Sequence, residues 1–147
     1  MKETLEKIVK LVRQAQKLAL SIGIDNIVQP GIIREIIMAE IMGHKVISTK
    51  QDADACDPDN PKIKYEYLSC SENGSGQFDR MFKSPPAAKE KSLKRITRNS
   101  KIYMGIFYEG QPLKAKVIYE IEPAVMKKAA LVKMEKSKKA QEVHLSI

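Results

Sequence analysis

The sequence contains no tryptophan, only two cysteines and two histidines, and no long apolar run. A membrane-spanning helix needs about 18 or more apolar residues in a row, so none is predicted. The first ten residues, MKETLEKIVK, include acids and lack a compact apolar core, which excludes a signal peptide and favours a cytoplasmic protein. Cys56 and Cys70 are therefore expected to be free thiols. The wide separation of His44 and His144 gives little support to a zinc site.

What is present is typical of a folded chain. Hydrophobic residues make up 43% of the sequence and charged residues 30%, which excludes a disordered protein. The length of 147 residues predicts one domain covering residues 1–147. The net charge of +8 permits binding to a polyanion without proving it, because basic helices are often only solvated surfaces. The basic residues form two clusters: Lys83, Lys89, Lys91, Lys94, Arg95, Arg98 and Lys101, and then Lys127, Lys128, Lys133, Lys136, Lys138 and Lys139.

Hydrophobic periodicity predicts the element order α-α-β-β-α-β-β-α. The helices are expected over residues 3–22, 30–42, 87–98 and 123–141, and the strands over 45–49, 62–70, 102–108 and 113–121. Residues 71–86, rich in glycine, serine and proline, are expected to form a loop. The order predicts an α/β or α+β fold in which helices flank a central mixed β-sheet.

Two carboxylates flank a predicted turn built on Pro58 and Pro61. Asp54 precedes this turn, and Glu66 lies within the strand predicted after it. Carboxylates placed in this way can converge on one divalent cation, with their oxygens roughly 4–6 Å apart. Mg²⁺ suits such a site, because it takes one or two carboxylates and keeps its other positions for water and phosphate. The alternative is that both residues are solvated surface acids.

Several segments follow one another in an order found in known nucleases. These are Leu18-Ala19-Leu20, the segment GIDNIVQ at 23–29, Asp54-Ala55, YEYLS at 65–69, IFYEG at 106–110 and IYEIEP at 118–123. Over about residues 9–125, the chain resembles type II restriction endonucleases of the PD-(D/E)xK nuclease superfamily. The resemblance implies a restriction-endonuclease-like fold, Mg²⁺ bound by Asp54 and Glu66, and a homodimer paired through its N-terminal helices that cleaves double-stranded DNA.

The resemblance also concerns the second helix, which can contribute an acid to such sites. Glu35 or Glu40 could take that place, and the alternative is an ion pair with Arg34 or Lys45 on the protein surface.

One departure from the family concerns the catalytic lysine, which is expected two residues after Glu66 but is replaced by Leu68. A leucine cannot donate a hydrogen bond to water or phosphate, so either the site is inactive or another residue supplies the cation. Lys64 lies two residues before Glu66 on the same strand face and could swing into the site, or it could simply face solvent. A leucine engineered in place of lysine is a further possibility. If Leu68 is natural and no other cation has replaced the lysine, Leu68→Lys is expected to raise cleavage.

A second departure concerns base recognition. In the resembled family a His-rich segment after the catalytic strand can read base edges, whereas this chain has residues 71–86 there, without histidine. The polar residues of this segment include Asn73, Gln77, Arg80 and Lys83. Arginine suits guanine, and asparagine or glutamine suits adenine, in the major groove. The alternative is that this segment is only a mobile connection. The basic residues Lys94, Arg95 and Arg98 are predicted to contact DNA phosphates.

Three functions therefore remain open. The first is a Mg²⁺-dependent, dimeric type II restriction endonuclease. The second is a catalytically inactive DNA-binding protein on the same fold, which Leu68 favours. The third is a basic α/β interaction module without a nucleic-acid role, against which the basic cluster at 83–101 and the carboxylate pair both count.

Overall fold

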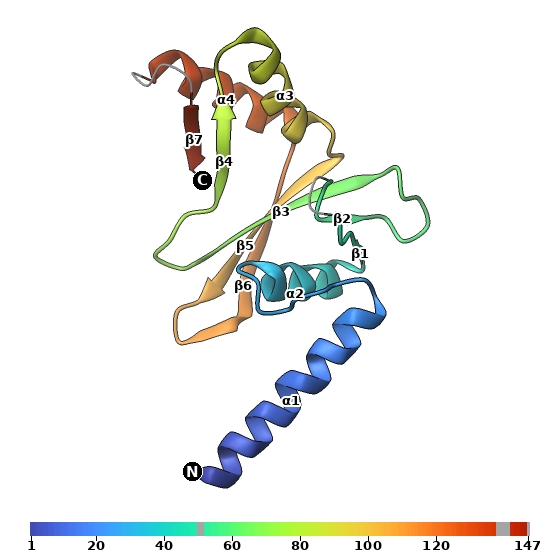
Figure 1. Cartoon of the computed structure of the whole chain (residues 1–147). Helices are drawn as coiled ribbons and strands as arrows, with labels where there is room; N and C mark the ends of the chain where they lie inside the picture. Colours follow the sequence, from blue (N-terminus) through green and yellow to red (C-terminus); the bar gives the residue numbers. More distant parts are fainter. Residues whose placement is uncertain (50–51, 138–141, 147) are drawn as a thin grey trace.

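The structure is a computed structural model that describes residues 1–49, 52–137 and 142–146, without the side chains of Gln77, Asp79, Arg80 and residues 142–146. Figure 1 shows an α+β fold in which α1 projects away from the sheet, while α3, α4, β4 and β7 gather at the other end. The described elements are α1 (Lys2–Ser21), α2 (Ile32–Met42), β1 (Lys45–Val46), β2 (Ala55–Cys56), β3 (Lys64–Ser71), β4 (Gln77–Phe82), α3 (Pro86–Thr97), β5 (Lys101–Tyr108), β6 (Gln111–Ile121), α4 (Pro123–Lys136) and β7 (Glu142–Ser146).

The main sheet is mixed and has the strand order β1-β2-β3-β5-β6. Strands β3 and β5 are parallel, with Tyr65 opposite Lys101, and the other neighbouring pairs are antiparallel. The chain between β3 and β5 runs through β4 and α3, so this crossover brings the end of α3 back to the start of β3. The backbone N–H of Ser100 fixes this return by donating to the carbonyl of Lys64 at 2.7 Å.

The two faces of the sheet carry separate cores, as the alternation of side chains along a strand requires. On one face, Leu68, Ile102 and Met104 pack with residues of β4, α3 and α4. On the other face, Tyr67 and Tyr103 pack with residues of α2. Glu66 precedes Tyr67 and therefore shares the α3 side of the sheet with Leu68.

Local sequence explains where the helices begin and end. Helix α3 begins at Pro86, whose missing N–H costs nothing in the first turn. Helix α2 ends at Met42 and is capped by Gly43, which has a φ of 70° and so adopts the left-handed conformation that glycine permits. The predicted boundaries of the first three helices therefore agree with the structure to within two residues. Among the described residues, no helix combines the length and apolar character needed to cross a bilayer.

Three predicted elements differ from the structure, and strand β2 was absent from the predicted order. The strand predicted over residues 45–49 ends at Val46. The segment 71–86, predicted to be a loop, contains strand β4, and the last helix ends at Lys136 instead of continuing to residue 141. Residues after the end of α4 return as β7, which pairs antiparallel with β4. The pairing has a register shift between Phe78 and Met81, which breaks the period-two pattern by which a strand is recognised. The predicted free thiols are confirmed, and Cys56 and Cys70 are both buried.

Candidate active site

The main chain holds Asp54 against strand β3. Asp54 directly precedes β2, whose Ala55 pairs with Tyr65. Its carboxylate oxygen Oδ2 accepts a hydrogen bond from the backbone N–H of Tyr67 at 2.8 Å. Its own N–H donates to the carbonyl of Tyr65 at 3.1 Å. Both bonds fall on the residues that flank Glu66 in sequence, so the structure brings the two predicted metal ligands together.

Glu66 lies in a mostly buried position, with its side chain 14% exposed. Burial, followed by the charge of Asp54, raises the pKa of Glu66 to about 8, while Arg98 and Arg95 oppose the increase. Burial also raises the pKa of Asp54 to about 6, against the hydrogen bond from Tyr67 and the charges of the same two arginines. The carboxylates are thus close enough to repel each other. The separation of roughly 4–6 Å between their oxygens stays a prediction.

A third carboxylate, Glu35, reaches this site from α2. Burial and the charge of Asp54 together raise its pKa to about 7. Neither Glu35 nor Glu40 makes an ion pair with the residues that the structure describes. The expected partner Arg34 instead bonds to the carbonyl of Pro112 and the hydroxyl of Ser71. Glu40 is exposed, so Glu35 is the acid of this helix that faces the candidate site.

A cavity of about 390 Å³ borders Asp54, and its lining also includes Glu35 and Asp52 but not Glu66. Within the described part of the chain, no three His, Cys, Asp or Glu side chains are grouped as a ready-made metal site. The donor set that fits a hard divalent cation is therefore the Asp54–Glu66 pair, with other positions open to water or phosphate. Mutual repulsion between two buried carboxylates is what a bound cation would relieve.

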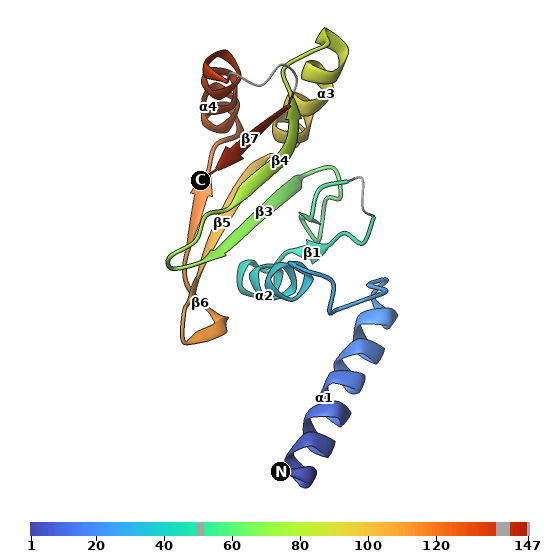
Figure 2. The same cartoon turned by 60° about the vertical axis from the view of Figure 1, so that its left-hand side comes forward.

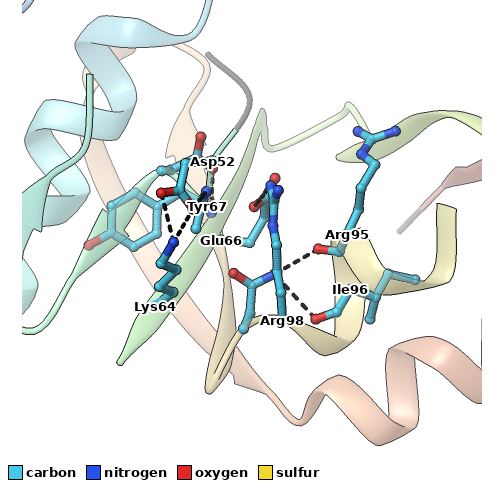
Figure 3. Close-up of polar contacts among 10 residues, drawn as sticks. Asp52, Lys64, Glu66, Tyr67, Arg95, Ile96 and Arg98 are labelled. Atoms are coloured by element: carbon cyan, nitrogen blue, oxygen red, sulfur yellow. Dashed lines mark hydrogen bonds and ion pairs between the residues drawn. The ribbon is translucent and has the colours of Figure 1, made fainter. Parts of the chain in front are cut away.

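The cations around this pair divide into two groups (Figure 3). Lys64, the predicted alternative to the missing lysine, donates from Nζ to both oxygens of Asp52 at 2.5 and 2.7 Å. That contact is the main cause of the lowered pKa of Asp52. Arg98 instead turns toward Glu66, with 3.6 Å between Nη2 and Oε2. The structure thus couples Lys64 to Asp52 and Arg98 to Glu66.

The end of α3 positions the two arginines. Asn99 is 4% exposed, and its side-chain amide donates to the carbonyls of Arg95 at 2.8 Å and Ile96 at 3.2 Å. These bonds tie the last turn of the helix to the segment that enters β5. Sequence reasoning placed Arg95 and Arg98 on a DNA-binding helix but did not place them beside Asp54 and Glu66. The order β3-α3-β5 could have predicted that the two arginines lie beside the carboxylates, because a parallel crossover returns the chain to the same end of the sheet.

Leu68 belongs to the hydrophobic core and not to the carboxylate site. It is 7% exposed and packs in the cluster that contains Ile102 and Met104. A Cβ atom built on Gly76 would lie 3.2 Å from the Cβ of Leu68, so the turn before β4 closes over this side chain.

Of the residues predicted to read bases, the two whose side chains the structure describes, Asn73 and Lys83, do not contact Asp54 or Glu66. Asn73 is exposed and follows the end of β3, whereas Glu66 lies near the start of that strand. Lys83 donates from Nζ to the carbonyl of Ser137 at 2.8 Å. Lys94 is exposed on α3 and lies 3.4 Å from Glu90. The side chains of Gln77 and Arg80 lie outside the described residues.

No protein-family model and no curated protein matches this chain.

The raised pKa values predict that the metal-free protein loses stability as pH increases. Unfolding returns Asp54 and Glu66 to ordinary pKa values of 3.8 and 4.5, below their folded values of about 6 and 8. Between about pH 4 and 8 the folded state therefore binds more protons, and each rise in pH favours unfolding. Glu66→Gln removes the larger shift. Denaturant unfolding in EDTA at pH 5 and pH 8 should show the parent losing at least about 1 kcal/mol more than this variant. Equal losses of stability in the parent and in Glu66→Gln would contradict the raised pKa of Glu66.

Proposed function

We propose that this chain is a divalent-metal-dependent deoxyribonuclease with a restriction-endonuclease-like fold, which cleaves double-stranded DNA. The observation that carries the proposal is the buried Asp54–Glu66 pair with Arg95 and Arg98 beside it. Phosphodiester cleavage needs a cation held by acids, together with positive charge where negative charge develops. Acids that could hold the cation and arginines that could supply the charge lie together near the start of β3, which supports the proposal.

Each residue has a defined part in the proposed reaction. Asp54 and Glu66 would hold Mg²⁺, which when bound supplies a Lewis acid and a water of lowered pKa. The N–H of Tyr67 fixes the orientation of the Asp54 carboxylate. Glu35 borders the same cavity and adds negative charge that attracts the cation.

Positive charge on α3 supports the DNA part of the proposal. Lys89, Lys94 and Lys127 line a groove of about 370 Å³ between α3 and α4. Contacts from such lysines to phosphates displace counterions, and each contact lowers the logarithm of affinity by about 0.9 per log unit of salt. Lys94 and Arg95 are therefore proposed to contribute to binding on any duplex sequence.

Incubation of plasmid DNA with Mg²⁺ or Mn²⁺, combined with a gel shift in Ca²⁺ on the same DNA, tests this function. Cleavage supports the nuclease. Binding without cleavage selects the second candidate, an inactive DNA-binding protein on the same fold, which is favoured by the burial of Leu68 where the resembled family has lysine. If the protein neither binds nor cleaves the DNA, both the nuclease and the inactive DNA-binding protein are rejected.

The proposed functional unit is a homodimer, because two sites related by a two-fold axis match the symmetry of duplex DNA. Helix α1 stands apart from the body in both views of the molecule (Figures 1 and 2). Ala19 is its one buried residue, while Leu5, Ile8, Val9 and Val12 are 43–54% exposed along one side. Such an unpartnered apolar stripe fits a second copy of the same helix.

Val12→Lys is expected to convert this dimer to a monomer, since it places a charge within the apolar stripe. Gln14→Lys adds the same charge on the opposite side of α1 and should leave the dimer intact. Sedimentation velocity at micromolar concentration distinguishes the two. A monomeric parent protein would reject the dimer, and a dimeric Val12→Lys variant would move the interface away from α1.

A further inference from the structure

The site has a carboxylate pair for a cation but no lysine at the expected place. Leu68 is enclosed by core residues, and Lys64 is engaged by both oxygens of Asp52. A reaction at phosphate still requires a cation close to the phosphate oxygens as negative charge develops there. The question is which side chain of this chain stands near enough to Glu66 to supply it.

Arg98 has the required position. It comes from the end of α3, and its Nη2 lies 3.6 Å from Oε2 of Glu66. Its side chain is 30% exposed, so one part of it lies against Glu66 while another part is open to solvent. The bonds from Asn99 to the last turn of α3 limit the movement of the backbone that carries it.

The chemistry of the guanidinium also fits. Its planar group can donate two parallel hydrogen bonds to two phosphate oxygens. A scissile phosphate that binds a cation held by Asp54 and Glu66 would come within reach of a group already in contact with Glu66. Burial of Glu66 strengthens this interaction, because the local dielectric is lower than in water.

We infer that Arg98 is a catalytic residue of this protein, which pairs with Glu66 when no metal is bound and donates to the scissile phosphate when metal and DNA are bound. This inference rests on the proposed nuclease function. It assigns to an arginine on α3 the role that a lysine on β3 has in the resembled family. It also predicts a competition, since Arg98 and the divalent cation both neutralise Glu66.

The experiment compares the full chain with Arg98→Met, Arg98→Lys and the matched control Lys91→Met, which removes an exposed cation from the same helix. Three quantities are measured: Mn²⁺ affinity by titration calorimetry without DNA, duplex affinity by gel shift in Ca²⁺, and single-turnover cleavage in Mn²⁺. Circular dichroism melting confirms that each variant is folded.

Arg98→Met is expected to bind Mn²⁺ at least as tightly as the parent, because a competing cation has been removed from Glu66. Its cleavage rate should fall by about 10²–10³-fold, while Arg98→Lys recovers part of the loss. Lys91→Met should keep a single-turnover rate at saturating protein within about threefold of the parent.

Two results overturn the inference in different ways. If the parent cleaves DNA and Arg98→Met cleaves within about threefold of it, Arg98 is not catalytic and the nuclease function stands. If the parent binds Mn²⁺ and DNA but cleaves no duplex, the nuclease function and the role of Arg98 fail together.

Discussion

Glu66→Gln and Asp54→Asn should each reduce metal-dependent DNA cleavage by about 10³-fold or more. Both substitutions keep the shape of the side chain but remove the negative charge that holds a divalent cation. A bound cation contributes several kcal/mol to the stabilisation of charge in the transition state, and each 1.36 kcal/mol corresponds to a factor of ten in rate. Titration calorimetry with Mn²⁺ measures the loss of metal binding, and single-turnover cleavage measures the loss of rate.

The same variants should act differently on DNA binding. In EDTA, whatever negative charge the Asp54–Glu66 pair carries repels the phosphates, so removing one carboxyl group should leave duplex affinity unchanged or increase it. Glu40→Gln is the matched control, because Glu40 is exposed on α2 while Glu35 of the same helix faces the site. It should cleave like the parent. Full cleavage by Glu66→Gln would exclude Glu66 as a ligand and with it the proposed site.

Much of the fold follows from local patterns in the sequence. Helix α1 has apolar residues at helical spacing and ends before Gly23, whose φ of 85° continues no helix. Strands β5 and β6 are joined through Glu109 and Gly110 in a tight hairpin, as the turn composition predicts. In each case the residues that specify the helix or the turn belong to that element or directly follow it.

The β4–β7 pair could not be predicted in this way. Its strands are separated by α3, β5, β6 and α4, and the bulge between Phe78 and Met81 disguises β4. What stabilises β4 is tertiary: Phe78 and Met81 are each 1% exposed, and both pack in the core that contains Met104. Burial of this kind overrides the loop-like composition of the preceding glycines and serines.

The candidate site likewise combines a contact that local sequence predicts with one that depends on tertiary structure. Asp54 and Glu66 are separated by a short turn, so their proximity follows from a local pairing of β2 with β3. Arg98 reaches Glu66 through a parallel crossover, and no spacing in the sequence reports that contact. For Lys64, the strand face it shares with Glu66 did not predict which residue its side chain would pair with. Its ammonium pairs with Asp52, which was not among the predicted site residues.

Leu68→Lys is expected to destabilise the protein by about 2–4 kcal/mol, instead of simply restoring a catalytic lysine. Leu68 is 7% exposed, and Met104 and Gly76 close the space around it. An ammonium buried there loses its hydration, and the carboxylate it would need, Glu66, already faces Arg98. Denaturant unfolding should show the loss, whereas Leu68→Met, which conserves volume, should cost less than about 1.5 kcal/mol.

Cleavage by the same variant separates the two possible sources of the catalytic cation. If Arg98 supplies the charge, Leu68→Lys adds none where it is needed, and its single-turnover rate at 10 °C, where the variant is still folded, should not exceed that of the parent. A rate raised by about 10²–10³-fold with stability retained would mean that a lysine at this position reaches the phosphate. That result would make the natural site an attenuated one that lacks its lysine. The burial of Leu68 in the cluster that contains Met104 favours the first outcome, because a lysine at this position would have to leave packed apolar surroundings before its ammonium reached the phosphate.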